Sequence, residues 1–78
     1  MVFRLYLVDR ETGKSTGKKR DYASTELFLK YGVETYERYN REFYYSDRPT
    51  NLKAKLCYLD ENNKWIELSK EQLTELGL

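Results

Sequence analysis

Apolar and polar residues alternate over the first nine positions of the chain. The residues on one side of this segment are all large and apolar, namely Phe3, Leu5 and Leu7. This period of two predicts a β-strand over residues 2–9 with that side toward a core. The polar stretch 10–18 contains two glycines that suit a turn. We therefore expect a hairpin whose returning strand, 19–23, is short and charged, as exposed edge strands often are.

A capped helix follows the first hairpin. Ser24 is a good N-cap, and Glu26 falls in the first turn, where the helix dipole favours an anion. The next apolar residues recur at helical spacing and are expected to form a buried stripe: Leu27, Phe28 and Tyr31. Gly32 then provides a natural C-cap or a point at which the helix bends.

Helical spacing continues beyond Gly32. The recurring apolar residues are Val33, Tyr36, Tyr39 and Phe43, and two acid-first pairs at i, i+4 accompany them, Glu34–Arg38 and Glu37–Arg41. We expect a second helix, or a continuation bent at Gly32, that ends near Phe43. Aromatic and β-branched residues weaken this helical propensity, so a strand over 43–46 is the alternative.

The last third of the chain predicts a second hairpin and a final helix. The apolar residues that alternate with the others there are Leu52, Ala54, Leu56 and Tyr58. They indicate a strand over 52–59, followed by a turn at 60–63 and a returning strand over 64–68. Ser69 and Gln72 form a capping box, which begins a helix that turns Leu73 and Leu76 inward and stops at Gly77.

The pattern as a whole predicts an α+β fold with the order β-β-α-(α)-β-β-α. Two antiparallel β-hairpins supply about four strands, which we expect to join in one sheet, and two or three helices pack on one face. The order of the strands is not specified by the pattern. With 78 residues, 40 % of them apolar and 35 % charged, we expect residues 1–78 to form a single small globular domain.

The amino-acid composition argues against catalysis. The chain has no histidine and one cysteine, Cys57, which excludes a zinc site built from one chain and leaves Cys57 without an activating base. The serines and threonines lack a histidine base as well, and no apolar frame surrounds any pair of carboxylates. We therefore predict no catalytic residues, no metal, no cofactor and no enzymatic activity.

Two short motifs have simpler interpretations than binding sites. The stretch Gly13–Gly17 contains Gly-Lys-Ser but lacks the earlier glycine and the following helix of a phosphate-binding loop, so it is typical of a hairpin tip. Asp60 and Glu61 lack the spacing of a calcium loop and indicate a polar turn.

The expected location is the cytoplasm. A secreted domain of this length would normally carry several disulfides, whereas Cys57 has no partner in the chain. The apolar segment 1–9 is too short to span a membrane and lacks the features of a signal peptide. We therefore expect no contact with a membrane.

A surface rich in tyrosine and arginine is the leading candidate for binding. The chain holds eight tyrosines, and exposed tyrosine beside arginine is typical of protein interfaces. The expected protein-binding residues are Tyr36, Arg38, Tyr39, Arg41, Tyr44, Tyr45 and Arg48. The alternative is that Tyr36, Tyr39 and Phe43 simply pack on the sheet. The partner would be another protein or a second copy of the chain.

Nucleic-acid binding through the hairpin 10–20 is the second hypothesis. A basic β-ribbon can follow phosphates while a neighbouring tyrosine stacks on bases. The residues expected to do so are Arg10, Lys14, Lys18, Lys19, Arg20 and Tyr22. Lysine-rich hairpin tips also protect sheet edges, and the net charge of the chain is only +1.

The charge is nevertheless distributed unevenly along the chain. Residues 1–55 hold twelve Lys or Arg and eight Asp or Glu, a balance of +4, whereas residues 56–78 hold two and five, a balance of −3. Such a division favours an acidic partner or a head-to-tail contact between two copies. In its size and its lack of catalytic motifs the chain resembles small accessory proteins of phages and mobile elements, many of which bind host proteins. This resemblance concerns type alone and assigns no residue a role.

Overall fold

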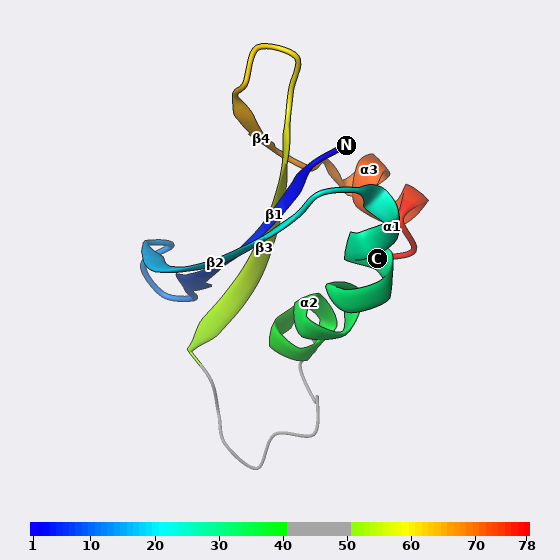
Figure 1. Ribbon diagram of the computed structural model, residues 1–78. Coiled ribbons are helices and arrows are strands. Elements are labelled where there is room, and N and C mark those ends of the chain that lie inside the picture. Colours follow the sequence, from blue (N-terminus) through cyan, green and yellow to red (C-terminus); the bar gives the residue numbers. More distant parts are fainter. Residues whose placement is uncertain (41–50) are drawn as a thin grey trace.

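The computed structural model describes residues 1–40 and 51–78. Within these ranges the elements follow the predicted order, and the α+β class is confirmed. They are β1 (Phe3–Asp9), β2 (Ser15–Tyr22), α1 (Thr25–Tyr31), α2 (Val33–Asn40), β3 (Leu52–Leu59), β4 (Trp65–Glu67) and α3 (Lys70–Glu75) (Figure 1).

The four strands form one antiparallel sheet in the order β2-β1-β3-β4. The two hairpins meet through the pairing of β1 with β3, in which Leu5 lies opposite Leu56. On its other side Leu5 lies opposite Arg20 of β2. The sheet therefore has two different edges, a long and charged one formed by β2 and a short one formed by β4.

The strand β2 begins four residues earlier than the sequence pattern indicated. Its register with β1 shifts between Tyr6 and Val8, so extra residues of β2 bulge opposite β1. Gly17 lies in this bulge with a φ of 83°, which is unfavourable for any residue with a Cβ. The Thr16 hydroxyl donates a hydrogen bond to the Leu7 carbonyl at 3.1 Å and helps to hold the bulge against β1.

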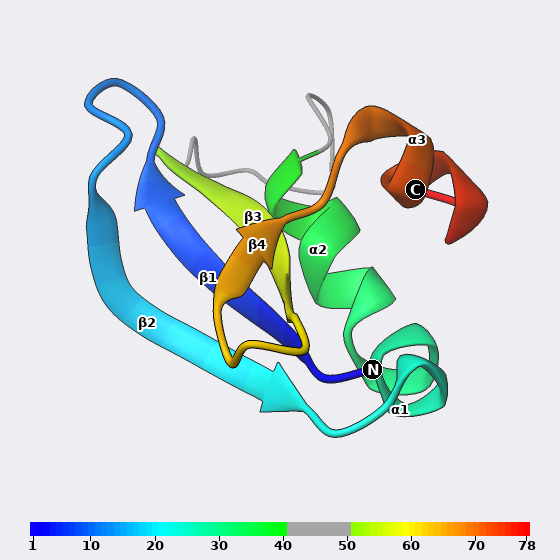
Figure 2. The same cartoon turned by 90° about the horizontal axis from the view of Figure 1, so that it is seen from above.

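The core lies between the sheet and the helices, which Figures 1 and 2 show on one side of the sheet. As predicted, the buried side of β1 presents Phe3, Leu5 and Leu7. Phe28 of α1 is fully buried, and its ring centroid lies 5.4 Å from that of Phe3 and 5.5 Å from that of Tyr22. The sheet contributes Tyr22, Ala54 and Leu56 to the same cluster, and Leu68 joins them.

The helix α1 buries less than its sequence predicted. Phe28 is its only buried residue, whereas Leu27 is 41 % exposed and Tyr31 is 57 % exposed. The prediction that these two residues lie in the core is therefore wrong. The helix packs against α2 and the end of β2, at a corner of the molecule, so only a narrow part of its surface faces the core.

Gly32 joins α1 to α2 as predicted. Its N–H donates to the Phe28 carbonyl at 2.7 Å, and its carbonyl accepts from the Tyr36 N–H at 2.9 Å. Its φ is −101°, so the close approach of Phe28, rather than an unusual backbone angle, makes glycine suitable here. The expected helix end near Phe43 and the alternative strand over 43–46 lie outside the described residues.

The carboxyl-terminal helix α3 begins with the predicted capping box. The Gln72 N–H donates to the Ser69 hydroxyl at 3.2 Å, and the Ser69 N–H donates to the Gln72 side chain at 2.9 Å. Leu73 and Leu76 pack against the core while partly exposed. None of the helices within 1–40 and 51–78 has the length and apolar character needed to cross a membrane.

Candidate functional site

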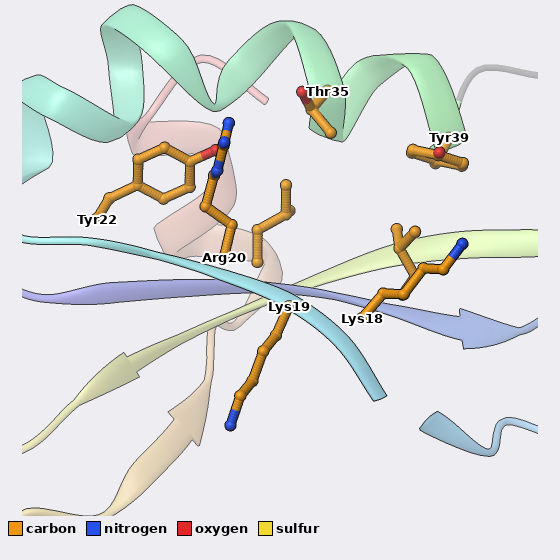
Figure 3. Close-up of a pocket in the computed structure, with 8 residues that line it drawn as sticks. Lys18, Lys19, Arg20, Tyr22, Thr35 and Tyr39 are labelled. Atoms are coloured by element: carbon orange, nitrogen blue, oxygen red, sulfur yellow. The ribbon is translucent and has the colours of Figure 1, made fainter. Parts of the chain in front are cut away.

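A cleft of about 210 Å³ lies between the edge strand β2 and the helix α2 (Figure 3). Leu5 and Leu7 of β1 line it with apolar surface, and Thr35 and Tyr39 line it from α2. The cleft exists because α2 packs chiefly against β3, which leaves the helix side of β2 partly uncovered. It therefore combines an apolar lining with polar groups contributed by the edge of the sheet.

The wall formed by β2 is basic. Lys18 and Arg20 extend toward α2, whereas Lys19 extends to the opposite side of the sheet (Figure 3). This division follows from the alternation of side chains along a strand. Among the described residues, neither the Lys18 side chain nor the Arg20 side chain forms a salt bridge or a hydrogen bond, and no acidic residue lines the cleft.

Tyr22 contributes a buried hydroxyl without a partner. The residue is 6 % exposed, and its ring packs edge-on against Phe28. Its hydroxyl is the one buried side-chain polar atom that has no hydrogen bond within the part of the chain that the structure describes. Figure 3 shows this hydroxyl on the side of the ring toward Arg20. An unpaired buried hydroxyl is costly, so the site gains free energy when a ligand satisfies it.

A second depression, of about 460 Å³, lies on the side of the sheet opposite to the helices. Arg4 dominates it, because its guanidinium binds the two carboxylate oxygens of Asp21 at 2.7 and 2.9 Å and lies 4.0 Å from the centroid of a Trp65 ring. The hydrogen bond from Arg4 lowers the pKa of the Asp21 carboxyl. Arg4 is therefore already paired, whereas Lys18 and Arg20 in the cleft have no ion pair among the described residues.

Cys57 lines the same depression but has little chemical reactivity. It is buried, and its thiol lies 3.6 Å from the Arg4 carbonyl. Burial raises the pKa of the Cys57 thiol, so the reactive thiolate is disfavoured at neutral pH.

The predicted protein-binding residues fall into two groups. Tyr36 and Tyr39 pack partly against the core, and burial raises the pKa of Tyr36. Arg38 forms a salt bridge with Glu34 at 3.3 Å, as its i, i+4 spacing suggested. Tyr39 alone of the three lines the cleft. The remaining residues of this prediction lie outside the described residues: Arg41, Tyr44, Tyr45 and Arg48.

The predicted nucleic-acid-binding residues are not on one surface. Arg10 donates hydrogen bonds to the carbonyls of Leu52 and Tyr39, and thereby ties the first hairpin to β3 and α2. Tyr22 lies in the core. The remaining four cations, namely Lys14, Lys18, Lys19 and Arg20, are exposed. Lys18 and Lys19 point to opposite sides of the sheet, so the basic ribbon is divided between two faces (Figure 3).

Sequence reasoning did not identify the cleft or the role of Thr35 in it. A cleft depends on which strand a helix covers, and strand order is not encoded in the periodicity of any single segment. One signal was present: β2 carries polar residues on both of its sides, from Ser15 to Asp21, which suggests a strand that is not fully covered.

Within 1–40 and 51–78, no three or more His, Cys, Asp or Glu side chains are grouped so that they could hold a metal ion. Comparison of the chain with models of known protein families, with curated proteins and with solved structures gives no match.

Proposed function

We propose that the chain is a non-enzymatic module that binds a partner protein through the surface formed by α1 and α2. The observation that supports this most strongly is the exposure of three large apolar side chains on α1. Leu27 is 41 % exposed, Leu29 is 44 % exposed and Tyr31 is 57 % exposed. Leu27 and Tyr31 are four residues apart and therefore lie on the same face of α1, and neighbouring exposed apolar side chains of this kind are typical of interaction sites.

The neighbouring helix supports the same proposal. α2 continues the chain directly after Gly32 and packs against α1. It carries Tyr39, which lines the cleft, and Arg38, which is exposed at the surface of the helix. Tyrosine and arginine are enriched at protein interfaces because each offers both contact area and directed hydrogen bonds. In this proposal the protein acts in the cytoplasm, as small accessory proteins of phages and mobile elements do.

The test is capture of a partner from a lysate of the native host with the intact chain as bait. We expect one host protein to be retained, and to be lost when Leu27→Ser and Tyr31→Ser are combined. Both side chains are largely exposed, so this double variant should stay folded. Ile66→Ser is the matched control, since Ile66 is 39 % exposed but lies on β4. Retention that is indifferent to the α1 double variant contradicts the proposed surface.

Self-association is a distinct outcome of the same proposal. Light scattering of the isolated chain over a wide range of concentrations measures its mass directly. If a second copy of the chain is the partner, the mass should rise from the monomer value to the dimer value as the concentration is raised. It should stay at the monomer value in the α1 double variant.

We propose nucleic-acid binding through the hairpin 10–20 as the second candidate function. It is supported by exposed cations of this hairpin, since Lys14, Lys18 and Arg20 have no salt bridge among the described residues. Lys18→Glu combined with Lys19→Glu should then abolish salt-sensitive binding of a short DNA or RNA strand. The Leu27→Ser and Tyr31→Ser double variant should leave the binding of the oligonucleotide unchanged, because both residues lie on α1. Binding of the oligonucleotide that survives this charge reversal contradicts the second candidate.

A further inference from the structure

We propose that the cleft between β2 and α2 receives a carboxylate side chain of the partner protein. Lys18 and Arg20 supply the positive charge, and the Tyr22 hydroxyl supplies a further hydrogen bond. This inference rests on the proposed function, because it takes the carboxylate to belong to a protein. It adds to that function an acidic residue in the partner and a defined place for it.

The charges in the cleft are arranged for one isolated anion. Lys18 and Arg20 extend into it from the same side of β2, and no acidic side chain among the described residues lines it. Neither cation has a salt bridge within the described ranges. A carboxylate placed between them forms charge-assisted hydrogen bonds without first displacing an existing ion pair.

The rest of the cleft favours a protein segment over a nucleic acid. Leu5 and Leu7 provide apolar surface, and Thr35 and Tyr39 provide neutral hydroxyls. A nucleic-acid backbone presents a regular series of phosphates and suits a continuous strip of cations. Lys19 is also among the residues that line the cleft, but its side chain points to the other side of the sheet (Figure 3), so the strip of cationic side chains is interrupted. An acidic residue flanked by apolar residues matches both the charge and the apolar surface.

Tyr22 provides an independent indication that the cleft accepts a ligand. Its hydroxyl is buried and unpaired within the described chain, so the free protein leaves a hydrogen-bonding group unused. The Arg20 side chain, which is exposed and has no ion pair with a described residue, can change its rotamer when an anion enters. In this proposal the movement opens a path to the hydroxyl, which Figure 3 shows on the side of the ring toward Arg20. A carboxylate oxygen then accepts the hydrogen bond that the free protein lacks.

The experiment uses the intact chain, labelled with nitrogen-15, and an acetylated and amidated pentapeptide that has one glutamate between two leucines. We expect the peptide to shift the amide resonances of Lys18, Arg20, Tyr22, Thr35 and Tyr39. A peptide with glutamine in place of the glutamate is the matched ligand control and should not shift them. Arg20→Gln should weaken binding of the glutamate peptide about tenfold.

Two further variants separate the cleft from general electrostatics. Lys19→Gln removes the same charge from the next residue of the strand, but on the opposite side of the sheet, and should change the affinity less than about twofold. Tyr22→Phe keeps the ring and removes the hydroxyl, and should weaken binding about threefold or more. An unchanged affinity in Tyr22→Phe overturns the assignment of the hydroxyl.

Other outcomes overturn the proposal as a whole. One is that the glutamine peptide shifts the same resonances equally. A second is that Lys19→Gln and Arg20→Gln lower the affinity for the glutamate peptide equally. A third is that inorganic phosphate or a short oligonucleotide shifts these resonances while the glutamate peptide does not. The proposed function is judged separately by the capture experiment. If the α1 double variant loses the partner while the glutamate peptide leaves the cleft resonances unmoved, the inference fails and the proposed function stands. If the peptide binds the cleft while the α1 double variant still captures the partner, the assignment of the cleft stands and the proposed α1 surface fails.

Discussion

The Asn40 side chain forms two hydrogen bonds with the backbone of Ala54. Its Nδ2 donates to the Ala54 carbonyl at 3.0 Å, and its Oδ1 accepts from the Ala54 N–H at 2.9 Å. On the other side Ala54 lies opposite Leu7 of β1, while β4 pairs only with Cys57–Leu59. The carboxamide therefore takes the place of a neighbouring strand for this part of β3 and fixes the end of α2 against the sheet.

Asn40→Ala should lower the free energy of unfolding by about 2 kcal/mol, because it leaves two backbone groups of β3 without partners. Asn40→Asp retains the acceptor but places a carboxylate oxygen against the Ala54 carbonyl, so it should also destabilise the protein at neutral pH. Urea unfolding followed by circular dichroism measures both. Glu34→Gln is the control from the same helix, since its salt bridge is exposed and should contribute less than about 1 kcal/mol. If Asn40→Ala lowers the free energy of unfolding no more than this control does, the two hydrogen bonds between Asn40 and Ala54 do not stabilise the fold as argued.

Gly32→Ala should destabilise the protein through a steric conflict with Phe28. A Cβ at position 32 would lie 2.5 Å from Cδ1 and 2.8 Å from Cε1 of the fully buried Phe28 ring. The expected loss is about 2 kcal/mol, in the range for an overpacked core.

Gly13→Ala is the matched control for this steric effect. Gly13 has a φ of 73°, but beyond its chain neighbours no atom lies within 4 Å of the position that an alanine Cβ would occupy. The cost there comes from the backbone alone and should be about 1 kcal/mol. Thermal unfolding of the two variants measures the difference. If Gly32→Ala destabilises the protein less than Gly13→Ala does, the Phe28 ring does not exclude a Cβ at the junction of α1 and α2.

Tyr22→Phe should leave the free energy of unfolding unchanged or raise it by up to about 1 kcal/mol, because the lost hydroxyl has no hydrogen bond within the described chain. Tyr22→Leu should lower it by about 2 kcal/mol through the lost ring contact with Phe28. Chemical unfolding of both variants provides the measurement. A marked destabilisation by Tyr22→Phe would show that the hydroxyl has a partner in solution.

The pair Arg4–Asp21 should make stability depend on pH in the acid range. The hydrogen bond from Arg4 lowers the pKa of Asp21 below its usual 3.8 in the folded protein. Its contribution is therefore complete above about pH 5 and is lost as the pH falls through the folded pKa, since the unfolded chain takes up the proton first.

The measurement is the urea midpoint of the original protein and of Asp21→Asn between about pH 2 and pH 6, a range that spans the titration of the carboxyl. The original should be the more stable of the two at the upper end of this range, and the difference should shrink as the carboxyl is protonated. The effect should be small, because the Asp21 side chain is 47 % exposed and water screens its charge. A difference that stays constant over this range would show that Asp21 acts through something other than its charge.

The parts of the fold that were predictable from sequence depend on local signals. Alternation located β1 and β3, and the Ser69–Gln72 capping box located the start of α3. Ser24 likewise begins α1, and its hydroxyl accepts from the Leu27 N–H at 3.2 Å. Each of these signals is contained within a few consecutive residues, and for that reason it is legible without knowledge of the rest of the molecule.

The parts that were not predictable depend on neighbours distant in sequence. Leu27 and Tyr31 have the spacing of a buried stripe, yet α1 lies at a corner where the sheet cannot cover them. The cleft arises because α2 lies over β3 and not over β2, and the bulge at Gly17 arises from the pairing of β2 with β1. The cations Lys18 and Arg20 of the proposed site were identified from sequence. That they extend to one side of the sheet and Lys19 to the other could be seen only once β2 was placed in the sheet.

The central pairing of β1 with β3 has a consequence for how the chain folds. Phe3 lies opposite Tyr58, so the middle of the sheet is closed by residues from distant parts of the sequence. Each hairpin can form early from local contacts, but neither can bury its apolar side until this distant pairing is made. We therefore expect the pairing of β1 with β3, which joins the two hairpins, to be the rate-limiting event in folding. Substitutions at this pairing should slow folding more than they speed unfolding.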